Sequence, residues 1–452
     1  MTKQSKDISK FLSDEYKGYV FYVLQNRALP DLRDGLKTGA RKIIHAAFNG
    51  GLKSGASKKL LNLSGDTLNL SLYPHGDASL NGTIVTLSQQ FRFNLNPLYV
   101  DGQNGTLRTP KAISAPRYLY VSLSEYADIW KTDSELLEYI YDEGQYVEPE
   151  CFLPIIPTVI CNMQEGMAPG YRFYCMSYNP TDVTKYCIAV LEKSKKKPTI
   201  SPYIRDIPKT AWSFDKETGG WTCSGTYKVL KSTTLEISEL PYNIDFDDFE
   251  SILNKQIEKG IVKDYVNNSS GRDISYKIKF TTVGKAKLTD KQVDKYVGTT
   301  LKLTKQVPSD QLYVLDENKK IRYFNNIYEL TEYFVNWRLS IYKKRKTLLL
   351  DILNKKLSKN TDLARFIDLI IKNKLKINNR PQKDIKVDMD KYKLPWELVH
   401  TSMVRCTKEE YDKLLKDNKE LEAEIKRIKK QTIEEMYIDD LKQLNAVLTK
   451  QF

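Results

Sequence analysis

Metal ligands and paired cysteines are scarce in this chain of 452 residues. It has three histidines and six cysteines, and no two of the cysteines follow a C-x-x-C spacing. Such a composition argues against a zinc site, and a chain of this length needs no disulfides to fold. We therefore expect a reducing, intracellular environment.

Long apolar runs are missing as well. No stretch reaches the roughly 18 uninterrupted apolar residues of a membrane-spanning helix. No apolar segment follows the polar residues 1–7, as a secretion signal would require. The phosphate-binding pattern G-x-x-x-x-G-K-[ST] does not occur either. We expect no membrane association and no ATPase module in this sequence.

The chain has an excess of positively charged residues. Lys and Arg together number 71 against 57 Asp and Glu, which gives a formal net charge of +14. A polyanionic partner such as nucleic acid fits this excess, although a ribosomal or membrane-surface role would fit the charge alone equally well. With 41% hydrophobic and 28% charged residues, the composition is that of a globular protein long enough for two or three domains.

Three segments differ in their hydrophobic pattern. Residues 1–150 show apolar side chains at helical spacing, first up to Pro30 and again after Gly35, and then change to short strands and turns. Residues 151–325 mix strands and helices. Residues 326–452 are rich in Lys and Glu, lack glycine and have helical spacing throughout.

The last segment predicts two long helices. The first runs from about residue 328 to 373, and the second carries side chains at alternating four- and three-residue steps, namely Leu414, Asn418, Leu421, Ile425 and Ile428. Two such helices form an antiparallel coiled coil most simply, with a globular tip between them. The polar Asn418 would fix the register of this seam. A plain pair of surface helices in a bundle is the alternative.

Four sequence blocks in the first 170 residues carry the most specific signal. They are N-R-A-L-P-D-L-R-D-G-L-K from Asn26, with Arg41-Lys42 behind it, Y-P-H-G-D from Tyr73, V-D-G-Q from Val100 leading to A-P-R-Y at Tyr118, and L-P-I-I-P-T from Leu153 leading to G-M-A-P-G. In this order and near this spacing, the blocks resemble the type IIA topoisomerases, the gyrase A and topoisomerase IV class, and most closely the medium subunits of T-even phages. One block alone would be weak evidence, whereas four in order are strong.

The resemblance implies a multidomain α+β fold. Its expected parts are an N-terminal helical arm (1–26), a winged-helix breakage–reunion domain (27–150), a mixed tower domain (151–325), and a long antiparallel coiled coil with a globular dimerisation tip at the C-gate (326–452). Two copies would close a ring around DNA. We expect cytoplasmic action, in an infected bacterial host.

The implied function is that of the DNA-cleaving and religating subunit of an ATP-dependent type II topoisomerase. Such an enzyme makes a transient double-strand break through a 5′-phosphotyrosyl link and passes a second duplex through it. Residues 437–448 keep helical spacing, which leaves no segment for a DNA-wrapping domain behind the coiled coil. We therefore expect relaxation and decatenation rather than negative supercoiling.

Tyr118 is the predicted nucleophile. A phenol is a weak nucleophile at neutral pH, so neighbouring groups must stabilise the transition state. Arg117 can offer a planar fork to the scissile phosphate, and the resemblance implies that His75 donates a hydrogen bond to a phosphate oxygen. Outside these blocks, the Arg117–Tyr118 pair would be read as part of a half-buried strand and His75 as an ordinary loop residue.

The resemblance also assigns DNA contacts. Five cations match family positions that line the DNA groove and would contact phosphates, namely Arg27, Arg33, Lys37, Arg41 and Lys42. Met167 stands where the family has an Ile that wedges between base pairs. A solvated basic helix face is the alternative for the cations, and core packing is the alternative for Met167.

The sequence departs from the family pattern at several positions. Tyr73 replaces the first His of the usual Y-H-P-H-G-D run, and the stretch from Asp101 to Tyr118 is one residue shorter than usual. Quinolone-sensitive bacterial relatives carry a Ser and an acidic residue at two positions where this chain has Ala78 and Gly82. The resemblance therefore implies resistance to drugs that need a metal bridge at those side chains.

The acidic run Asp245, Asp247 and Asp248 superficially resembles a two-metal site. It follows the block Glu239-Leu-Pro-Tyr242, which opens a helix in the family, so we expect Asp245 to cap that helix. We therefore assign no metal site to this chain. The resemblance implies that Mg²⁺ and ATP are bound by a separate Toprim/ATPase subunit of the gyrase B type. With that partner, the chain would work as a homodimer on double-stranded DNA.

Two other classes of protein share some of these features. A tyrosine recombinase would need an H-x-x-R element before its Tyr, and none of the three histidines is followed by Arg three residues later. A non-enzymatic, basic coiled-coil protein that organises DNA would explain the charge and the C-terminal helices. It gives no reason for the four blocks, so we retain it as the alternative.

Overall fold

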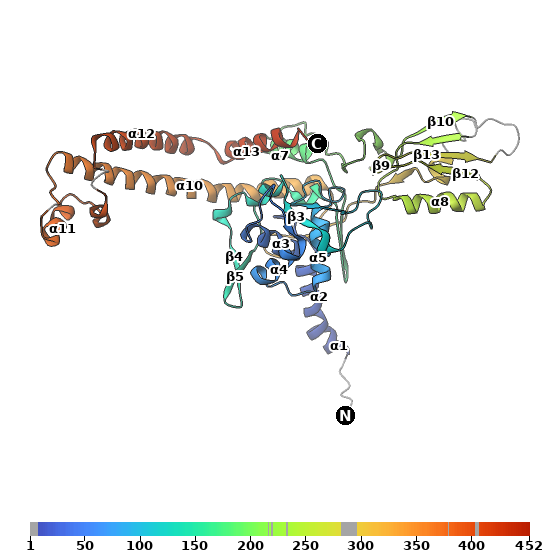
Figure 1. The fold of residues 1–452 in the computed structure, drawn as a ribbon, viewed down its shortest axis with the longest axis horizontal. Coiled ribbons are helices and arrows are strands. Elements are labelled where there is room, and N and C mark those ends of the chain that lie inside the picture. Colours follow the sequence, from blue (N-terminus) through green and yellow to red (C-terminus); the bar gives the residue numbers. More distant parts are fainter. Residues whose placement is uncertain are drawn as a thin grey trace, which may run out of the picture. The chain divides into compact units, whose positions relative to one another are not determined.

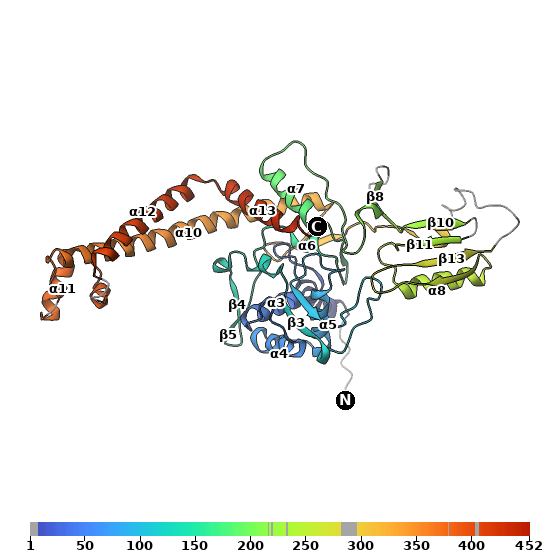
Figure 2. The same cartoon turned by 45° about the horizontal axis from the view of Figure 1, so that its top comes forward.

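The computed structural model describes residues 8–215, 217, 220–231, 234–281, 296–377, 379–402 and 406–452. The chain divides into two compact units, one made of Met1–Val335 with Leu441–Phe452 and the other of Asn336–Asp440. Figures 1 and 2 show their helices and strands in sequence colours. Within the described ranges, no helix is both long enough and apolar enough to cross a lipid bilayer.

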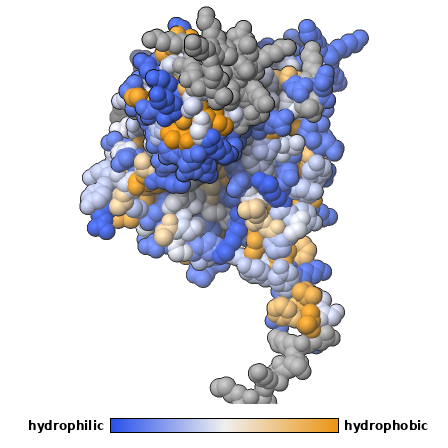
Figure 3. All heavy atoms as spheres, turned by 90° about the vertical axis from the view of Figure 1, so that its right-hand side faces the viewer, coloured by the Kyte–Doolittle hydropathy of each residue, from blue (hydrophilic) through white to orange (hydrophobic). Residues whose placement is uncertain are grey.

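A helical run opens the first unit. It comprises α1 (Ile8–Phe11), the π-helical turn η1 (Leu12–Tyr16), α2 (Lys17–Val23) and a second π-helical turn, η2 (Leu24–Ala28). The predicted helix that ends before Pro30 is thereby confirmed. Several apolar side chains of α1 and α2 are exposed (Figure 3), and burial begins at Leu24 and Ala28, where η2 contacts α3 and β6.

Three helices and a small sheet contain most of the motif blocks. The helices are α3 (Thr38–Asn49), α4 (Leu60–Ser71) and α5 (Asp77–Ser88), and the antiparallel sheet has the order β1 (Lys58–Lys59), β3 (Tyr120–Leu123), β2 (Leu98–Asp101). Every residue of α3 from Ala40 to Ala47 is buried, because α4, α5 and β5 pack around it. The β2–β3 ladder ends at the pair Asp101–Tyr120. Residues 102–119 form the loop between these strands, and Tyr118 lies near the end of this loop.

Short hairpins and helices complete this part of the first unit. The antiparallel hairpins are β4–β5 (Tyr139–Asp142 and Gln145–Pro149), β6–β7 (Gln164–Ala168 and Tyr171–Cys175) and β15–β16 (Leu312–Leu315 and Ile321–Phe324). The helices are α6 (Thr158–Cys161) and α7 (Pro180–Leu191), with 3-10 turns at Pro116–Tyr118, Ala127–Lys131, Ser134–Leu136 and Lys209–Ala211 and a π-helical turn at Tyr296–Thr300.

Two further sheets belong to the first unit. One has the order β14 (Thr304–Gln306), β9 (Gly220–Ser224), β8 (Trp212–Asp215), and the other has the order β10 (Tyr227–Lys231), β11 (Thr234–Ile237), β13 (Tyr276–Phe280), β12 (Val262–Asn267). Helix α8 (Phe246–Glu258) covers one face of the four-stranded sheet, where its Phe249 and Leu253 share a core with Ile278. Asp245 accepts a hydrogen bond from the amide of Asp248 at 2.7 Å, so the predicted helix cap is confirmed.

The second unit contains most of the helical C-terminal segment. Its elements are most of α10 (Ile327–Ile371), α11 (Gln382–Lys391), the 3-10 turn Trp396–His400, α12 (Lys408–Lys430) and the start of α13 (Ile433–Leu448). The two predicted long helices are present. The Asn418 side chain on α12 is buried and donates to Thr361 of α10 at 3.4 Å, as expected for a polar residue in the seam between them. A separate apolar cluster, which includes Phe366, Ile385 and Met389, packs α11 against the end of α10.

Candidate active site

Tyr118 lies on an exposed turn, directly before the buried residue Leu119. Pro116 starts the 3-10 turn, and the amide of Tyr118 donates to the carbonyl oxygen of Ala115 at 2.9 Å. The Tyr118 side chain is 68% exposed, whereas Leu119 is fully buried and its carbonyl oxygen accepts from the amide of Leu60. A half-buried strand position is therefore ruled out for Tyr118. The fold presents its phenol to solvent from a fixed main chain.

Arg117 precedes the phenol on the same turn and is exposed. No ion pair of Arg117 is found among the described residues. An exposed guanidinium at this place can turn towards a phosphate that approaches Tyr118, and its planar fork matches two phosphate oxygens. The structure thus brings these two predicted residues together.

His75 pairs with Arg27, one of the predicted DNA-contacting cations. Arg27 Nε lies 3.3 Å from His75 Nε2, and an Nη of Arg27 lies 3.0 Å from His75 Nδ1. The ring of Tyr73 meets the His75 ring edge-on at 5.4 Å. Partial burial and the positive charge of Arg27 lower the pKa of His75 below its usual 6.5. Because arginine only donates, Arg27 forms its hydrogen bond with the ring nitrogen that carries no proton. Among the described hydrogen bonds, none joins this pair to Tyr118.

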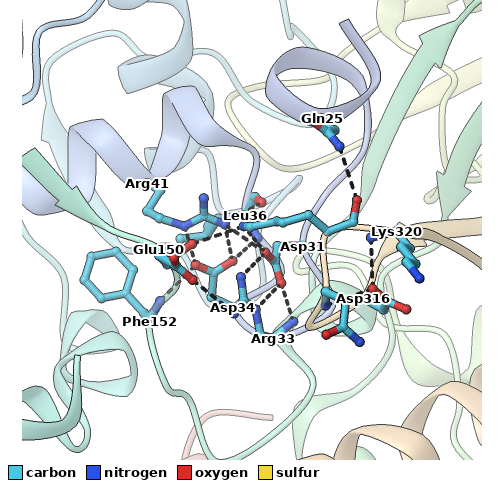
Figure 4. A network of polar contacts seen from close by, with 12 residues as sticks. Gln25, Asp31, Arg33, Asp34, Leu36, Arg41, Glu150, Phe152, Asp316 and Lys320 are labelled. Carbon is cyan, nitrogen blue, oxygen red and sulfur yellow. Dashed lines mark hydrogen bonds and ion pairs between the residues drawn. The ribbon is translucent and has the colours of Figure 1, made fainter. Parts of the chain in front are cut away.

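Beneath this surface, α3 is anchored by a buried network of acids and arginines. Figure 4 shows Arg33 and Arg41 directed at Asp31 and Asp34. Arg33 binds both carboxylate oxygens of Asp31, at 3.0 and 2.9 Å, and Arg41 binds both oxygens of Asp34, at 2.6 and 3.0 Å. Burial alone would raise the pKa of Asp31, but Arg33, Arg41 and Lys319 together lower it to about 2. These groups remain charged in the folded chain.

This burial excludes the alternative of a solvated basic helix face for three of the five predicted DNA-contacting cations. Arg33, Arg41 and Lys42 are all less than 9% exposed, and Lys42 donates to Glu148 at 2.7 Å and to the carbonyl oxygen of Ser71 at 2.5 Å. The physical reason is that elements pack on both sides of α3, so its cations meet internal acids. Their role in this structure is to hold the fold. Direct phosphate contact stays a prediction for all five cations, of which Arg27 and Lys37 are the less buried two.

Lys37, the second of those cations, lies where the β6–β7 hairpin meets η2. Its ammonium donates to the carbonyl oxygen of Glu165 at 2.7 Å, and burial lowers its pKa. At Gly166 a Cβ atom would stand 1.9 Å from the carbonyl oxygen of Ala28, so only glycine permits this close approach. The hairpin is thereby fixed against the helical run.

Met167 is the next residue of that hairpin, and its side chain is 71% exposed. It pairs across the ladder with Arg172, whose side chain is about half exposed. Core packing is therefore excluded as the reason for this methionine. An exposed apolar side chain beside a cation, on a hairpin held firmly at Gly166, has the form required of a wedge between base pairs.

The described residues contain no group of three or more His, Cys, Asp or Glu side chains that could hold a metal ion. Asp245, the first residue of the acidic run, is engaged as the cap of α8.

The mixed α+β fold is that of a topoisomerase II cleavage region. The crystal structure of the Plasmodium falciparum topoisomerase II DNA-binding, cleavage and re-ligation domain matches with a TM-score of 0.81 and 26% sequence identity. The match covers 97% of this chain and 65% of that chain. The fold of this chain is thus similar to that of a topoisomerase II DNA-binding and cleavage domain.

The family model for the A subunit of DNA gyrase/topoisomerase IV matches residues 27–443. The chain therefore belongs to this gyrase A and topoisomerase IV family, as the four blocks indicated. Its relatives include the mitochondrial DNA topoisomerase 2 of Dictyostelium discoideum, 28% identical over 94% of this chain and 34% of the relative. DNA topoisomerase 2-alpha of Mus musculus is 30% identical over 79% of this chain and 24% of the relative. The chain thus spans about a quarter to a third of the length of these relatives.

Proposed function

We propose that this chain is the DNA-cleaving and religating subunit of an ATP-dependent type IIA topoisomerase, with Tyr118 as its nucleophile. The observation that carries the proposal is the exposed phenol, which lies next to the exposed Arg117 on a turn fixed by β2 and β3. The phenolic Oη attacks a backbone phosphorus, and the bond from phosphorus to the 3′ oxygen breaks. The phenolic proton leaves to solvent, and the departing 3′ oxygen takes up a proton.

The product is a 5′-phosphotyrosyl ester that keeps the energy of the broken bond. Religation is the reverse attack by the 3′ hydroxyl and consumes no ATP. Arg117 would stabilise the charge on the phosphate oxygens, and His75, whose ring lies beside Arg27, would donate its ring N–H to a further phosphate oxygen. Charge-assisted donors of this kind act most strongly where charge develops in the transition state.

DNA binding is the second part of the proposal. Arg27 and Lys37 would contact phosphates, and Met167 would enter the base stack and bend the duplex. Helices α3–α5 with the β1–β3–β2 sheet would act as a winged-helix domain, and the region of α8 with its four-stranded sheet as a tower. The paired helices α10 and α12 would form the coiled coil through which two chains dimerise, with the α11 cluster at its tip.

Mg²⁺ and ATP are proposed to be bound by a Toprim/ATPase subunit of the gyrase B type. The support is that the relatives are three to four times as long as the part this chain matches. The proposed outcome of strand passage is relaxation and decatenation, in the cytoplasm of an infected bacterial host.

The test is covalent trapping of DNA by the chain together with its Toprim/ATPase partner. Denaturant added during the reaction should leave DNA covalently attached to wild-type chain and none attached to Tyr118→Phe, while both bind duplex DNA alike. A non-enzymatic DNA-organising protein would bind DNA and leave no adduct in either case. Chloroquine gels then resolve the topology, and accumulation of negatively supercoiled plasmid would contradict the relaxation proposal.

A further inference from the structure

The loop that carries Tyr118 is held at its middle as well as at its ends. Residues 102–119 join β2 to β3, and about halfway along them the side chain of Arg108 is buried, with 4% of its surface exposed. A buried guanidinium needs acceptors for its N–H groups, because removing its charge from water is unfavourable. The acceptors of Arg108 therefore show what this side chain holds.

Arg108 binds the short segment that leads into α8. Its Nη1 donates to the carbonyl oxygens of Pro241 at 2.8 Å and Ile244 at 2.9 Å. Its Nη2 donates to the carbonyl oxygen of Leu240 and to Oε1 of Glu239, both at 2.5 Å. Four acceptors from one segment thus converge on a single side chain of the loop.

A main-chain hydrogen bond also joins the loop to the start of α8. The amide of Phe246, the first residue of α8, donates to the carbonyl oxygen of Arg108 at 3.1 Å. On the loop side, Thr106 and Thr109 bond to each other through both their main chains and their hydroxyl groups. The Thr106 hydroxyl also accepts from the amide of Arg108 at 3.3 Å. The tip of the loop is therefore a closed turn joined to the start of α8.

Further hydrogen bonds connect the rest of the loop to its surroundings, between the tip and Tyr118. The side chain of Asn104 donates to the Ser88 hydroxyl at 2.8 Å, and the amide of Ser114 donates to the carbonyl oxygen of Gln103 at 2.9 Å. The two arms of the loop are thus bonded to each other and to the end of α5. The anchored tip is therefore connected to the turn that contains Tyr118 through hydrogen-bonded segments of the loop.

We propose that Arg108 is a positioning residue for Tyr118, which fixes the cleavage loop to the segment Glu239–Phe246 and sets the place of the phenol relative to the scissile phosphate. The inference rests on the proposed function of Tyr118. In this proposal, the block Glu239-Leu-Pro-Tyr242 is the part of the chain to which the loop is bonded. Because α8 packs against the four-stranded sheet, a displacement of that sheet reaches Tyr118 through Arg108.

Arginine is required at this position because of its shape. Lysine keeps the charge and most of the stem, but its single ammonium is a point donor that cannot reach four acceptors spread around a planar fork. Arg108→Lys therefore removes the anchor with little loss of packing. Arg205→Lys is the matched control, since the partly buried Arg205 bonds to Gln90 and Tyr126, which lie outside the loop.

The experiment measures adduct formation by each variant with the Toprim/ATPase partner, at saturating DNA. Misplacement of a reacting group by about 1 Å lowers a rate about 100-fold, so we expect Arg108→Lys to form adducts about 10- to 100-fold more slowly. Its dissociation constant for DNA should stay within about twofold of wild type, because only the chemical step is affected. Arg205→Lys should match wild type in both quantities, and Glu239→Gln, which keeps an acceptor oxygen, should lose less than Arg108→Lys.

Wild-type adduct formation by Arg108→Lys would overturn the inference, as would equal losses of adduct and of DNA affinity. Hydrogen exchange of the amides of residues 102–119 is a readout that needs no activity. We expect it to accelerate in Arg108→Lys and to stay unchanged in Arg205→Lys, and unchanged exchange in both would refute the anchor. Absence of adducts from the wild-type chain would refute the proposed function, while the exchange result would still decide the anchor.

Discussion

Replacement of Arg41 by Met should reduce folding stability far more than DNA affinity. Arg41 donates to Asp34 at 2.6 and 3.0 Å and lies 3.7 Å from Asp31. All three side chains are at most 3% exposed. Met fills much of the volume of the arginine stem but carries no charge. The variant therefore leaves two buried carboxylates without one of their cations.

The size of the effect follows from this burial. Removal of one partner of a buried ion pair typically costs about 3–5 kcal/mol, because the remaining charge stays in a medium that solvates it poorly. A domain has a free energy of unfolding of only about 5–15 kcal/mol. For a unit of this size, 1 kcal/mol corresponds to roughly 2 °C in melting temperature, so we expect a fall of about 6–10 °C.

Thermal unfolding followed by circular dichroism measures this change, and DNA titrations at several salt concentrations measure the affinity. Arg27→Met is the control, because Arg27 is exposed and bonds to His75 at the surface. Its free energy of unfolding should change by less than about 0.5 kcal/mol. An Arg41→Met variant that melts like wild type but binds DNA with a reduced salt dependence would refute the reasoning. It would show that Arg41 meets phosphate and does not hold the fold.

The pH dependence of the free energy of unfolding at acidic pH gives a second check on the buried network of Asp31 and Arg41. The pKa of Asp31 is lowered from 3.8 to about 2 in the folded chain, and Arg41 is one of the cations responsible. A lowered carboxyl pKa stabilises the fold above pH 3.8, and this contribution is lost as the pH falls towards 2. Without Arg41 the pKa of Asp31 rises in the folded chain. Arg41→Met should therefore show a smaller acid-dependent loss of stability in this pH range.

Three further predictions concern DNA and drugs. Arg27→Met should lower the slope of log affinity against log salt by about 0.9, the value for one phosphate contact, and an unchanged slope would remove Arg27 from the DNA interface. Met167→Ala should bend DNA less than wild type in a fluorescence energy transfer assay, Met167→Ile should bend it as wild type does, and equal bending by all three would exclude the wedge. The wild-type enzyme should resist quinolones because Ala78 and Gly82, on the exposed face at the start of α5, lack side-chain oxygens. The double change Ala78→Ser and Gly82→Glu should increase drug-trapped cleavage, and wild-type cleavage already trapped at low drug concentration would contradict this.

Features governed by local sequence were predicted well. The helix that ends before Pro30, the cap formed by Asp245 and the polar seam residue Asn418 all depend on neighbours within a few residues or on a regular repeat. The four blocks identified the family, and they led to Tyr118 and Arg117 on one exposed turn. The domain boundaries and the dimerising role of the tip stay predictions.

Features governed by distant partners could not be predicted. The spacing of Arg41 and Lys42 on α3 describes a basic face equally well whether solvent or buried acids lie opposite, and only the fold brings Glu148 to Lys42. Arg27 and His75 are separated by 48 residues, and no local pattern links them. The same holds for Arg108, whose buried contacts lie more than 130 residues away. The isolated charges of the chain thus acquire their roles only through packing.

The identity of the residue joined to DNA tests the account most directly. Trypsin acting on the trapped and nuclease-treated adduct should release the peptide 118–131, or 112–131 if the adduct blocks cleavage after Arg117. Both peptides also contain Tyr120, which is 41% exposed, and Tyr126, which is buried, so fragmentation by mass spectrometry discriminates among the three phenols. The account predicts the nucleotide mass on Tyr118 alone. A nucleotide on Tyr120, or an adduct that persists in Tyr118→Phe, would contradict it.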